Sequence, residues 1–530
     1  MATWFENERG LVLSPGVTEL RDVQVEALEW IASRSEPYLF INAPTGVGKT
    51  LINATYGVMS GLPWTYAVHT NVLQEQVSRT FENLPTLRGR RNFACLVEEG
   101  VTAAEAECAV DSECQCPYKT GDGGEPGQFC GYYGQRAAAF SAPQRTTNYA
   151  LFLRDFSLRR KDPITGVPRT KVLLADEAHN IEDAVVNAVE VSLNRRTCQR
   201  IGVKLPGYLG SMAEWVAWAK VQTTPSVRRG SPNNLGVMAV AGALGTLRGI
   251  TPSDEGNWII TPVDWGVKFE PVWGGPYVME KLFGHTGFVN GQLQSGQGGS
   301  VERAVMTSAT LMGAEYTADT LGLPVGSWAY LDLPSPFASR NRPVNFSPVT
   351  SMNATKVADP VARQPMQAAI DRLIEFYVLA GQPAGIIHAV SNKYRDIILS
   401  ESRWGGILTK DPVEHAEKVG RGEASVVVSA NMAEGWDGVD DLCRFVIMPK
   451  VPFPNLGDRR TSIRKDEDPR SFDHLALVAI VQGAGRGVRH SSDTADTWIL
   501  DGAWSMLYNR RRSWLPEAFT SAYHHKVQLP

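Results

Sequence analysis

The sequence lacks the long apolar run that a membrane-spanning helix requires, and it has no large excess of either charge. Its 530 residues include 52 Lys and Arg against 56 Asp and Glu, which gives a formal net charge of −4. A nearly neutral chain excludes a global attraction to nucleic acid, so any surface of that kind has to be local. No internal repeat of fixed period is present either.

Cysteine is scarce and unevenly distributed. The first nine residues contain acids where a secretory signal peptide has bases, so we expect a cytoplasmic protein. Of the 7 cysteines, five lie between Cys95 and Cys130. In a reducing compartment such a group predicts metal ligands rather than disulfides. Cys198 and Cys443 stand apart, and we expect them to be ordinary thiols.

A phosphate-binding loop precedes the cysteines. Residues 43–50 have the sequence A-P-T-G-V-G-K-T and follow an apolar run, residues 38–41, which predicts a buried strand leading into a helix. In such a loop the backbone N–H groups surround phosphate oxygens, the lysine reaches the β- and γ-phosphates, and the last threonine coordinates Mg²⁺. We therefore predict that this loop binds ATP through Thr45, Gly46, Gly48, Lys49 and Thr50.

A pair of acids follows the cysteines. Asp176 and Glu177 come at the end of a second apolar strand, residues 171–175, and are followed by Ala178 and His179. A phosphate-loop ATPase needs a Mg²⁺ ligand and a residue that positions the attacking water at such a strand end. We predict that Asp176, with Thr50, binds Mg²⁺, that Glu177 acts on the water, and that Lys49 stabilises the transferred phosphate.

The second half of the chain carries an arginine motif. Residues 482–489 have the form Q-x-x-G-R-x-x-R, which places Arg486 and Arg489 three residues apart on one helix face. Both guanidiniums are expected to reach the γ-phosphate across a cleft, with Gln482 beside the nucleotide. Short apolar strands with helical stretches between them recur along the whole chain. The pattern predicts an α/β fold with two parallel sheets, one formed up to about residue 330 and one after it.

With these motifs in place, the chain resembles the XPD/DinG family of superfamily 2 iron-sulfur DNA helicases. Arg21 and Gln24 resemble its leading nucleotide-sensing element, residues 66–76 its motif Ia, residues 307–311 its motif III and residues 434–437 its motif V. The resemblance implies two RecA-like motor domains with two domains inserted in the first. The expected limits are residues 1–86, 142–191 and 301–333 for motor domain 1, 87–141 for the iron-sulfur domain, 192–300 for an arch-like insertion, and 334–530 for motor domain 2.

The same resemblance implies a [4Fe-4S] cluster held by four cysteines. The expected ligands are Cys95, Cys108, Cys116 and Cys130, with Cys114 as the alternative to Cys116. Zinc also takes four cysteines, but its sites usually contain C-x2-C pairs, which this window lacks. The cluster is therefore favoured over zinc.

The resemblance implies an ATP-dependent DNA helicase that moves 5′ to 3′ on single-stranded DNA and unwinds forked duplex DNA as a monomer. The alternative is a non-unwinding nucleic-acid-binding ATPase that serves as a scaffold or switch. A translocase that prefers RNA or hybrid duplexes is a third interpretation.

Two local features bear on nucleic-acid contacts. Trp215 and Trp218 share a helix face that is expected to be core rather than a base-stacking platform. Basic residues form short runs that together would follow the backbone of a single strand. These are Arg88, Arg90 and Arg91; Arg159, Arg160 and Lys161; Arg459, Arg460, Arg464 and Lys465; and residues 510–512.

Overall fold

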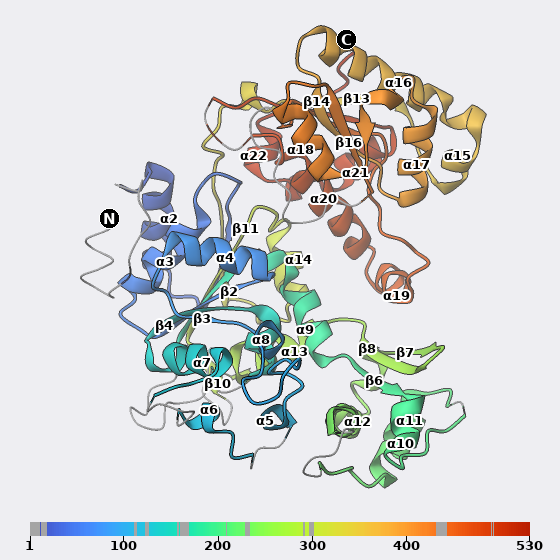
Figure 1. Ribbon diagram of the computed structural model, residues 1–530. Coiled ribbons are helices and arrows are strands. Elements are labelled where there is room, and N and C mark those ends of the chain that lie inside the picture. Colours follow the sequence, from blue (N-terminus) through green and yellow to red (C-terminus); the bar gives the residue numbers. More distant parts are fainter. Residues whose placement is uncertain are drawn as a thin grey trace.

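The computed structural model describes residues 11, 19–110, 114–121, 127–155, 158, 169–207, 209–227, 234–289, 292–295, 301–430, 442–488, 490 and 492–530. Within them, two seven-stranded sheets lie in separate halves of the molecule, each flanked by helices (Figure 1). All strand pairs in both sheets are parallel. The predicted α/β fold with two parallel sheets is confirmed.

The first sheet is built from segments on both sides of the cysteine window. Its strand order is β12-β1-β11-β5-β2-β4-β3. Strands β1, β2 and β5 are buried along their whole length because helices cover both faces of the sheet. The strands are β1 (Tyr38–Asn42), β2 (Trp64–Val68), β3 (Thr86–Leu87), β4 (Gln144–Asn148), β5 (Val172–Asp176), β11 (Arg303–Ser308) and β12 (Trp328–Asp332).

Polar side chains fix where several helices of this half begin. The Thr70 hydroxyl accepts a hydrogen bond from the backbone of Leu73, and Asn148 accepts one from Leu151, so each residue caps a helix. The helices are α2 (Asp22–Ser33), α3 (Lys49–Met59), α4 (Asn71–Thr80), α8 (Tyr149–Arg154), η3 (Ala178–Asn180), α9 (Ile181–Val189) and α14 (Ala314–Thr320).

The cysteine segment has little apolar core of its own. Buried Ala103, Cys130 and Tyr132 form its small cluster, against which Phe93 and Tyr118 pack. Its short elements are η1 (Arg90–Asn92), α5 (Glu107–Val110), α6 (Pro117–Thr120) and α7 (Gly131–Ser141). So small a core supplies little stability, which is why such segments commonly depend on a metal.

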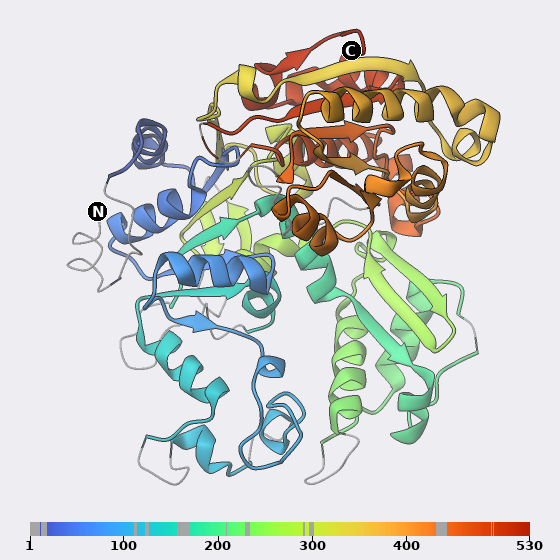
Figure 2. The ribbon, with the colours of Figure 1, turned by 45° about the horizontal axis from the view of Figure 1, so that its top comes forward.

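Residues 192–300 are here called the insertion. Its described residues up to 271 form a second lobe beside the cysteine segment (Figure 2), and those from 275 on lie against the first half of the molecule. Its antiparallel sheet has the order β6-β8-β7. The elements are β6 (Val191–Asn194), α10 (Arg195–Arg200), α11 (Met212–Val221), α12 (Asn234–Gly249), η4 (Glu255–Asn257), β7 (Trp258–Val263), β8 (Gly266–Pro271), α13 (Gly275–Val278), η5 (Met279–Phe283), β9 (His285–Val289) and β10 (Gln292–Ser295).

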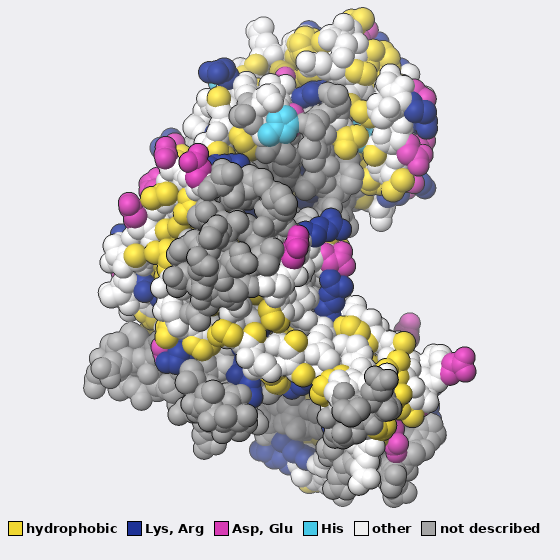
Figure 3. Space-filling view, turned by 60° about the vertical axis from the view of Figure 1, so that its left-hand side comes forward, with side chains coloured by type: hydrophobic (Ala, Val, Ile, Leu, Met, Phe, Trp, Pro, Cys, Tyr) yellow, Lys and Arg dark blue, Asp and Glu magenta, His cyan; other side chains and the backbone are white. Residues whose placement is uncertain are grey.

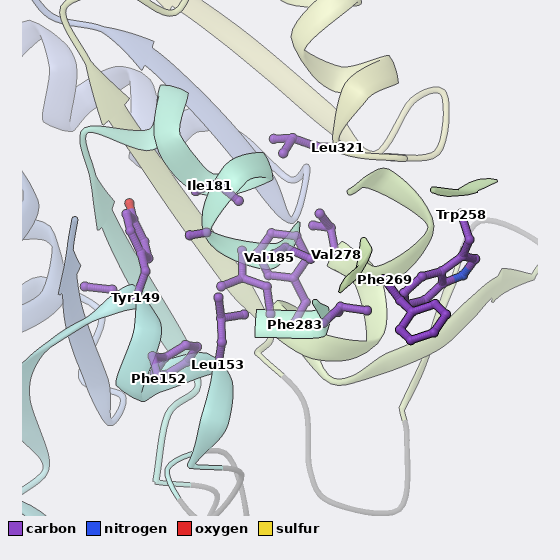
Figure 4. Packing of buried hydrophobic residues seen from close by; sticks show 14 of the residues in the cluster. Tyr149, Phe152, Leu153, Ile181, Val185, Trp258, Phe269, Val278, Phe283 and Leu321 are labelled. Carbon is purple, nitrogen blue, oxygen red and sulfur yellow. The ribbon is translucent and has the colours of Figure 1, made fainter. Parts of the chain in front are cut away.

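One apolar core joins the insertion to the first sheet. Figure 4 shows Phe152 of α8, Val185 of α9 and Phe283 of η5 packed together, with Trp258 and Phe269 extending the cluster toward β7 and β8. Trp215 is 2% exposed and contacts Phe269 with the ring centroids 5.0 Å apart. The prediction that Trp215 is core is therefore confirmed.

The second sheet has the order β15-β16-β14-β17-β18-β13-β19. Its strands are β13 (Val344–Thr350), β14 (Ala384–His388), β15 (Leu408–Thr409), β16 (Ser425–Ser429), β17 (Phe445–Met448), β18 (Asp496–Asp501) and β19 (Tyr523–His524). Its helices are η6 (Ser339–Asn341), α15 (Ala354–Ala358), α16 (Pro360–Leu379), α17 (Asn392–Glu401), η7 (Gly405–Ile407), α18 (Pro412–Gly420), α19 (Arg459–Glu467), α20 (Arg470–Ala484), α21 (Ala503–Arg511), η9 (Arg512–Trp514) and α22 (Glu517–Thr520).

The surface is deeply indented on one side between the two halves, with Lys, Arg, Asp and Glu side chains at the edge of the indentation (Figure 3). Across the ranges that the structure describes, no helix has both the length and the apolar character needed to cross a bilayer.

Candidate active site

Three neighbouring strands of the first sheet bring the predicted motifs together. Strands β1, β11 and β5 are adjacent, and Asn42 pairs in register with Ser308 while Thr307 pairs with Asp176. Because parallel strands end at the same edge of a sheet, the phosphate loop after β1 and the acids after β5 meet there. The topology therefore assembles a site from residues more than a hundred positions apart.

The phosphate loop needs its glycines for conformation and for space. Gly46 and Gly48 have φ values of 82° and 87°, in the left-handed region that side chains rarely adopt. A Cβ on Gly46 would lie 2.2 Å from the Phe337 ring, and a Cβ on Gly48 would lie 2.4 Å from Gln24 Nε2. Both positions exclude a larger residue.

Arg21 and Gln24 hold the loop from behind. Arg21 Nη1 donates to the Gly46 carbonyl, and Gln24 Nε2 donates to the Val47 carbonyl at 2.7 Å. Both residues were predicted to contact the nucleotide. In the structure both side chains contact the phosphate loop, and both line the cavity beside it that is described below.

The two acids have different surroundings. Lys49 Nζ lies 3.1 Å from Glu177 Oε1, and the Ser308 hydroxyl donates to Glu177 Oε2 at 3.1 Å. Asp176 is buried and accepts from the Tyr66 hydroxyl at 3.0 Å. Glu177 has a φ of 49°, an uncommon value for a residue other than glycine, which turns its side chain toward Lys49.

These surroundings move the two pKa values apart. Burial raises the pKa of Asp176, and the neighbouring Glu177 carboxylate adds to the effect, although Lys49 opposes it. Burial also disfavours ionised Glu177, but attraction to Lys49 and His179 outweighs it and lowers the Glu177 pKa. Glu177 is therefore the more readily ionised of the two in the nucleotide-free protein.

His179 connects the acids to the second half of the chain. Its Nδ1 lies 2.7 Å from the Ser308 hydroxyl, and its Nε2 lies 2.9 Å from Gln482 Nε2 on α20. Gln482 was predicted to lie beside the nucleotide, and it lines the same cavity. The bridging role of His179 was not predicted, although the residue lies only two positions after Glu177 in the sequence.

A cavity of about 790 Å³ lies between the two sheets, a size that suits a nucleotide. Every predicted site residue that the structure describes, apart from the cysteines, lines it: Arg21, Gln24, Thr45, Gly46, Gly48, Lys49, Thr50, Asp176, Glu177, Gln482 and Arg486. Arg489 and residues 434–437 lie outside the described residues. Phe337 and Arg342 also line the cavity and were not predicted as site residues.

The five clustered cysteines are all described, and all are thiols. Cys95 Sγ accepts hydrogen bonds from the backbone N–H groups of Val97 and Glu98, at 3.4 and 3.3 Å. Cys116 and Cys130 directly precede helices α6 and α7, whereas the Cys114 thiol donates to a Glu107 carboxylate oxygen at 3.8 Å. Among the described residues, no three Cys, His, Asp or Glu side chains converge closely enough to hold one metal ion.

Comparison with known proteins places the fold. The family model DEAD_2 matches residues 73–198, and Helicase_C_2, a helicase C-terminal domain, matches residues 408–521. The solved structure named XPD_Helicase superposes with a TM-score of 0.59 at 16% identity, over 96% of this chain and 100% of that chain. In these two family models and in its fold, the chain is similar to the XPD/DinG-like superfamily 2 helicases. In the terms of this family, the two sheets are the two RecA-like motor domains.

Other relatives show the same similarity. The structure of S. tokodaii Xpd4 superposes with a TM-score of 0.53 at 13% identity, over 95% of this chain and 100% of that chain. ATP-dependent DNA helicase CHL1 of Saccharomyces cerevisiae is 24% identical over 132 residues, and that of Vanderwaltozyma polyspora is 30% identical over 136 residues. These matches cover 21% and 22% of this chain, but only 15% and 16% of the two relatives.

Proposed function

We propose that this chain is an ATP-dependent DNA helicase that moves 5′ to 3′ on single-stranded DNA and separates duplex strands. The observation that carries the proposal is the cleft itself. Lys49, Asp176 and Glu177 from motor domain 1 face Gln482 and Arg486 from motor domain 2 across one cavity. The names of the CHL1 relatives support the reaction, and the polarity and unwinding rest on the family resemblance.

The residues divide the work of phosphoryl transfer. Lys49 neutralises charge on the β- and γ-phosphates, and ATP binding draws it away from Glu177. Glu177 then orients and deprotonates the attacking water, with the Ser308 hydroxyl and His179 beside its carboxylate. Arg486 stabilises charge that develops on the transferred group from the side of motor domain 2.

Mg²⁺ fits the oxygen donors at the end of β5. The Thr50 hydroxyl and one carboxylate, Asp176, are a sufficient protein contribution, since Mg²⁺ in such sites takes its other ligands from phosphate and water. Tyr66 orients the Asp176 carboxylate through its hydroxyl. Bound Mg²⁺ would supply charge neutralisation at the phosphates.

Lys49→Ala tests the site. It should reduce DNA-stimulated ATP hydrolysis by roughly a thousandfold or more while leaving the far-ultraviolet circular dichroism spectrum unchanged. Lys220→Ala, a lysine on α11 of the insertion, is the matched control. Normal hydrolysis by the Lys49 variant would show that the site is wrongly assigned. A strand-displacement assay on wild-type protein distinguishes a helicase from the non-unwinding ATPase.

We propose that the cysteine segment holds a [4Fe-4S] cluster through Cys95, Cys108, Cys116 and Cys130. The backbone N–H groups of Val97 and Glu98 donate to Cys95 Sγ, as backbone donors do to the sulfurs of iron-sulfur sites. Cys114 is the poorer candidate because its thiol donates to the Glu107 carboxylate, a hydrogen bond that a metal-bound thiolate would lose. The four thiols of a [4Fe-4S] site would each bind a different iron, so they need not converge on one point. A bound cluster would stabilise this small segment.

Iron and sulfide analysis of protein purified without air tests the cluster. We expect about four iron and four sulfide per chain, with a broad visible absorption band. Cys116→Ser should lose iron, whereas Cys114→Ser should retain it. Stoichiometric zinc without iron would contradict the proposal, and iron loss in the Cys114 variant alone would exchange the two ligands.

The remaining assignments stay predictions. They are the domain limits, the cytoplasmic location, the monomeric state and the preference for forked DNA over RNA or hybrid duplexes. Competition for binding between DNA and RNA strands of equal length tests the last of these.

A further inference from the structure

Helix α19 reaches out of motor domain 2 toward α9 and the β7–β8 hairpin of the insertion (Figure 1). Its central contact is Arg464, whose Nη2 lies 2.8 Å from Glu182 Oε2 on α9. The Arg464 guanidinium also lies over the Trp273 ring, 4.2 Å from its centroid. The side chain is only 9% exposed, so this ion pair is largely desolvated.

Further contacts surround this ion pair. Arg460 Nη1 lies 2.8 Å from Asp183 Oδ1, and Arg460 Nε donates to the Val272 carbonyl at 2.9 Å. Arg459 donates to the Ile260 carbonyl at 2.7 Å, and the Trp273 indole N–H donates to Glu467 at 2.6 Å. We call the contacts of α19 with α9 and with residues 258–273 the α19 clamp.

The basic run at α19 therefore differs from its expected use. The sequence analysis placed Arg459, Arg460 and Arg464 on the path of a nucleic-acid strand. In the structure their guanidiniums bind carboxylates and carbonyls of the neighbouring domains.

The clamp is connected to the active site through α9. Glu182 follows His179 by three residues, and its other carboxylate oxygen accepts from the Gly274 backbone at 3.0 Å. The Glu182 side chain on α9 therefore contacts both α19 and the insertion, and α9 follows the acid motif in the chain. A cavity of about 170 Å³ between the motor domains is lined by both His179 and Arg464.

We propose that the α19 clamp transmits the movement of motor domain 2 to the insertion during the ATP cycle, with Arg464 and Arg460 as the positioning residues. The inference rests on the proposed helicase function. A change in the nucleotide cleft that shifts motor domain 2 has to move α19, because α20 follows α19 directly and carries Gln482 at its far end. The contacts that reach the insertion are the Trp273 ring under Arg464 and the Val272 carbonyl that accepts from Arg460, so a shift of α19 pulls on that part of the insertion. The ion pairs with Glu182 and Asp183 on α9 hold the two arginines in position for these contacts.

The test compares duplex opened with ATP hydrolysed. Arg464→Ala, and separately Arg460→Asp, should lower the number of base pairs opened per ATP several-fold. The KM for ATP and the DNA-stimulated kcat should stay within about twofold of wild type. Adding Asp183→Arg to Arg460→Asp restores the ion pair with α9 but not the hydrogen bond to the Val272 carbonyl, so the ratio should stay low. Full rescue would assign the effect to the contact between the motor domains and overturn the link to the insertion.

Arg403→Ala is the matched control. Arg403 also pairs with a glutamate and lies beside a tryptophan ring, but both partners belong to motor domain 2. An unchanged ratio in the clamp variants would overturn the proposal, and so would a parallel fall in ATP hydrolysis. The Arg460 and Asp183 pair, in which the Asp183 side chain is 52% exposed, keeps the test available if Arg464→Ala fails to fold.

A second readout separates this proposal from the helicase proposal. In wild-type protein, a non-hydrolysable ATP analogue should change hydrogen–deuterium exchange in residues 258–273, and Arg464→Ala should abolish that change. The same result without strand separation would leave the clamp standing and overturn the helicase assignment. No change in wild-type protein would overturn the clamp.

Discussion

At the residue scale, substitution of two glycines should distinguish the effect of backbone strain from the effect of a steric collision. Gly46 and Gly61 both have positive φ, but a Cβ on Gly46 would collide with Phe337, whereas a Cβ on Gly61 meets nothing within 4 Å. Gly46→Ala should weaken ATP binding by roughly tenfold or more, about 1.4 kcal/mol, because the loop or Phe337 has to move. Gly61→Ala should cost about 1 kcal/mol of stability and leave ATP affinity unchanged. Equal ATP affinities, measured by calorimetry, would contradict this reading of Phe337.

His388, at the end of β14, makes stability depend on pH. Burial lowers its pKa from 6.5 to about 3. Below pH 6.5 the imidazole of His388 is protonated in the unfolded chain but stays neutral in the folded chain. Stability is therefore lost as the pH falls from 6.5 toward about 3.

Substitution by glutamine tests this effect. Between pH 6.5 and about pH 5 the wild type should lose about 2 kcal/mol of unfolding free energy through His388, and His388→Gln should not show this loss. As the pH is lowered from about 7.5 to about 5, the unfolding temperature of wild type should fall relative to that of the variant. A difference that is constant with pH would show that His388 is not the group responsible.

At the scale of elements, the first turn of α20 is bound to α21, and the last turn contributes Gln482 to the cavity. Buried Asp473 in its first turn accepts from Arg510 at 2.6 Å and from Arg511 at 2.8 Å, which ties α20 to α21. The other end carries Gln482. Asp473→Ala should lower stability by about 2 kcal/mol, since two charge-assisted hydrogen bonds are lost. Asp396→Ala, which breaks an exposed pair on α17, should change it by less than about 0.5 kcal/mol. Thermal unfolding of both variants checks the contrast.

The elements were largely predictable, and their contacts were not. The apolar runs at residues 38–41 and 171–175 became buried parallel strands, because a sheet covered on both faces requires continuous apolar strands. In the sequence, the basic run of α19 cannot be distinguished from one that is solvated or binds phosphate. Folding brings the acids of α9 beside these arginines, and only this shows that they form a contact between domains.

At the scale of the whole molecule, the hydrogen bond between Gln482 and His179 links the two motor domains across the cleft. Gln482→Ala should reduce the stimulation of ATP hydrolysis by single-stranded DNA several-fold, because the acid motif loses its contact with motor domain 2. Gln367→Ala, which removes a contact to Asp371 within α16, should leave the stimulation unchanged. Steady-state ATPase assays with and without oligonucleotide measure both. Full stimulation of the Gln482 variant would mean that this bond does not couple the domains.

The sequence by itself determined the chemistry that contiguous residues can specify. A glycine-rich loop ending in Lys49 and Thr50, an acid pair at a strand end, and five cysteines in one window have fixed local spacing, and each spacing matches a ligand. The tertiary structure decided which distant groups act together. Gln482 and His179 are 303 residues apart and Arg464 and Glu182 are 282 apart. Such pairs depend on how two domains pack, and the free energy of packing belongs to whole surfaces rather than to any short segment.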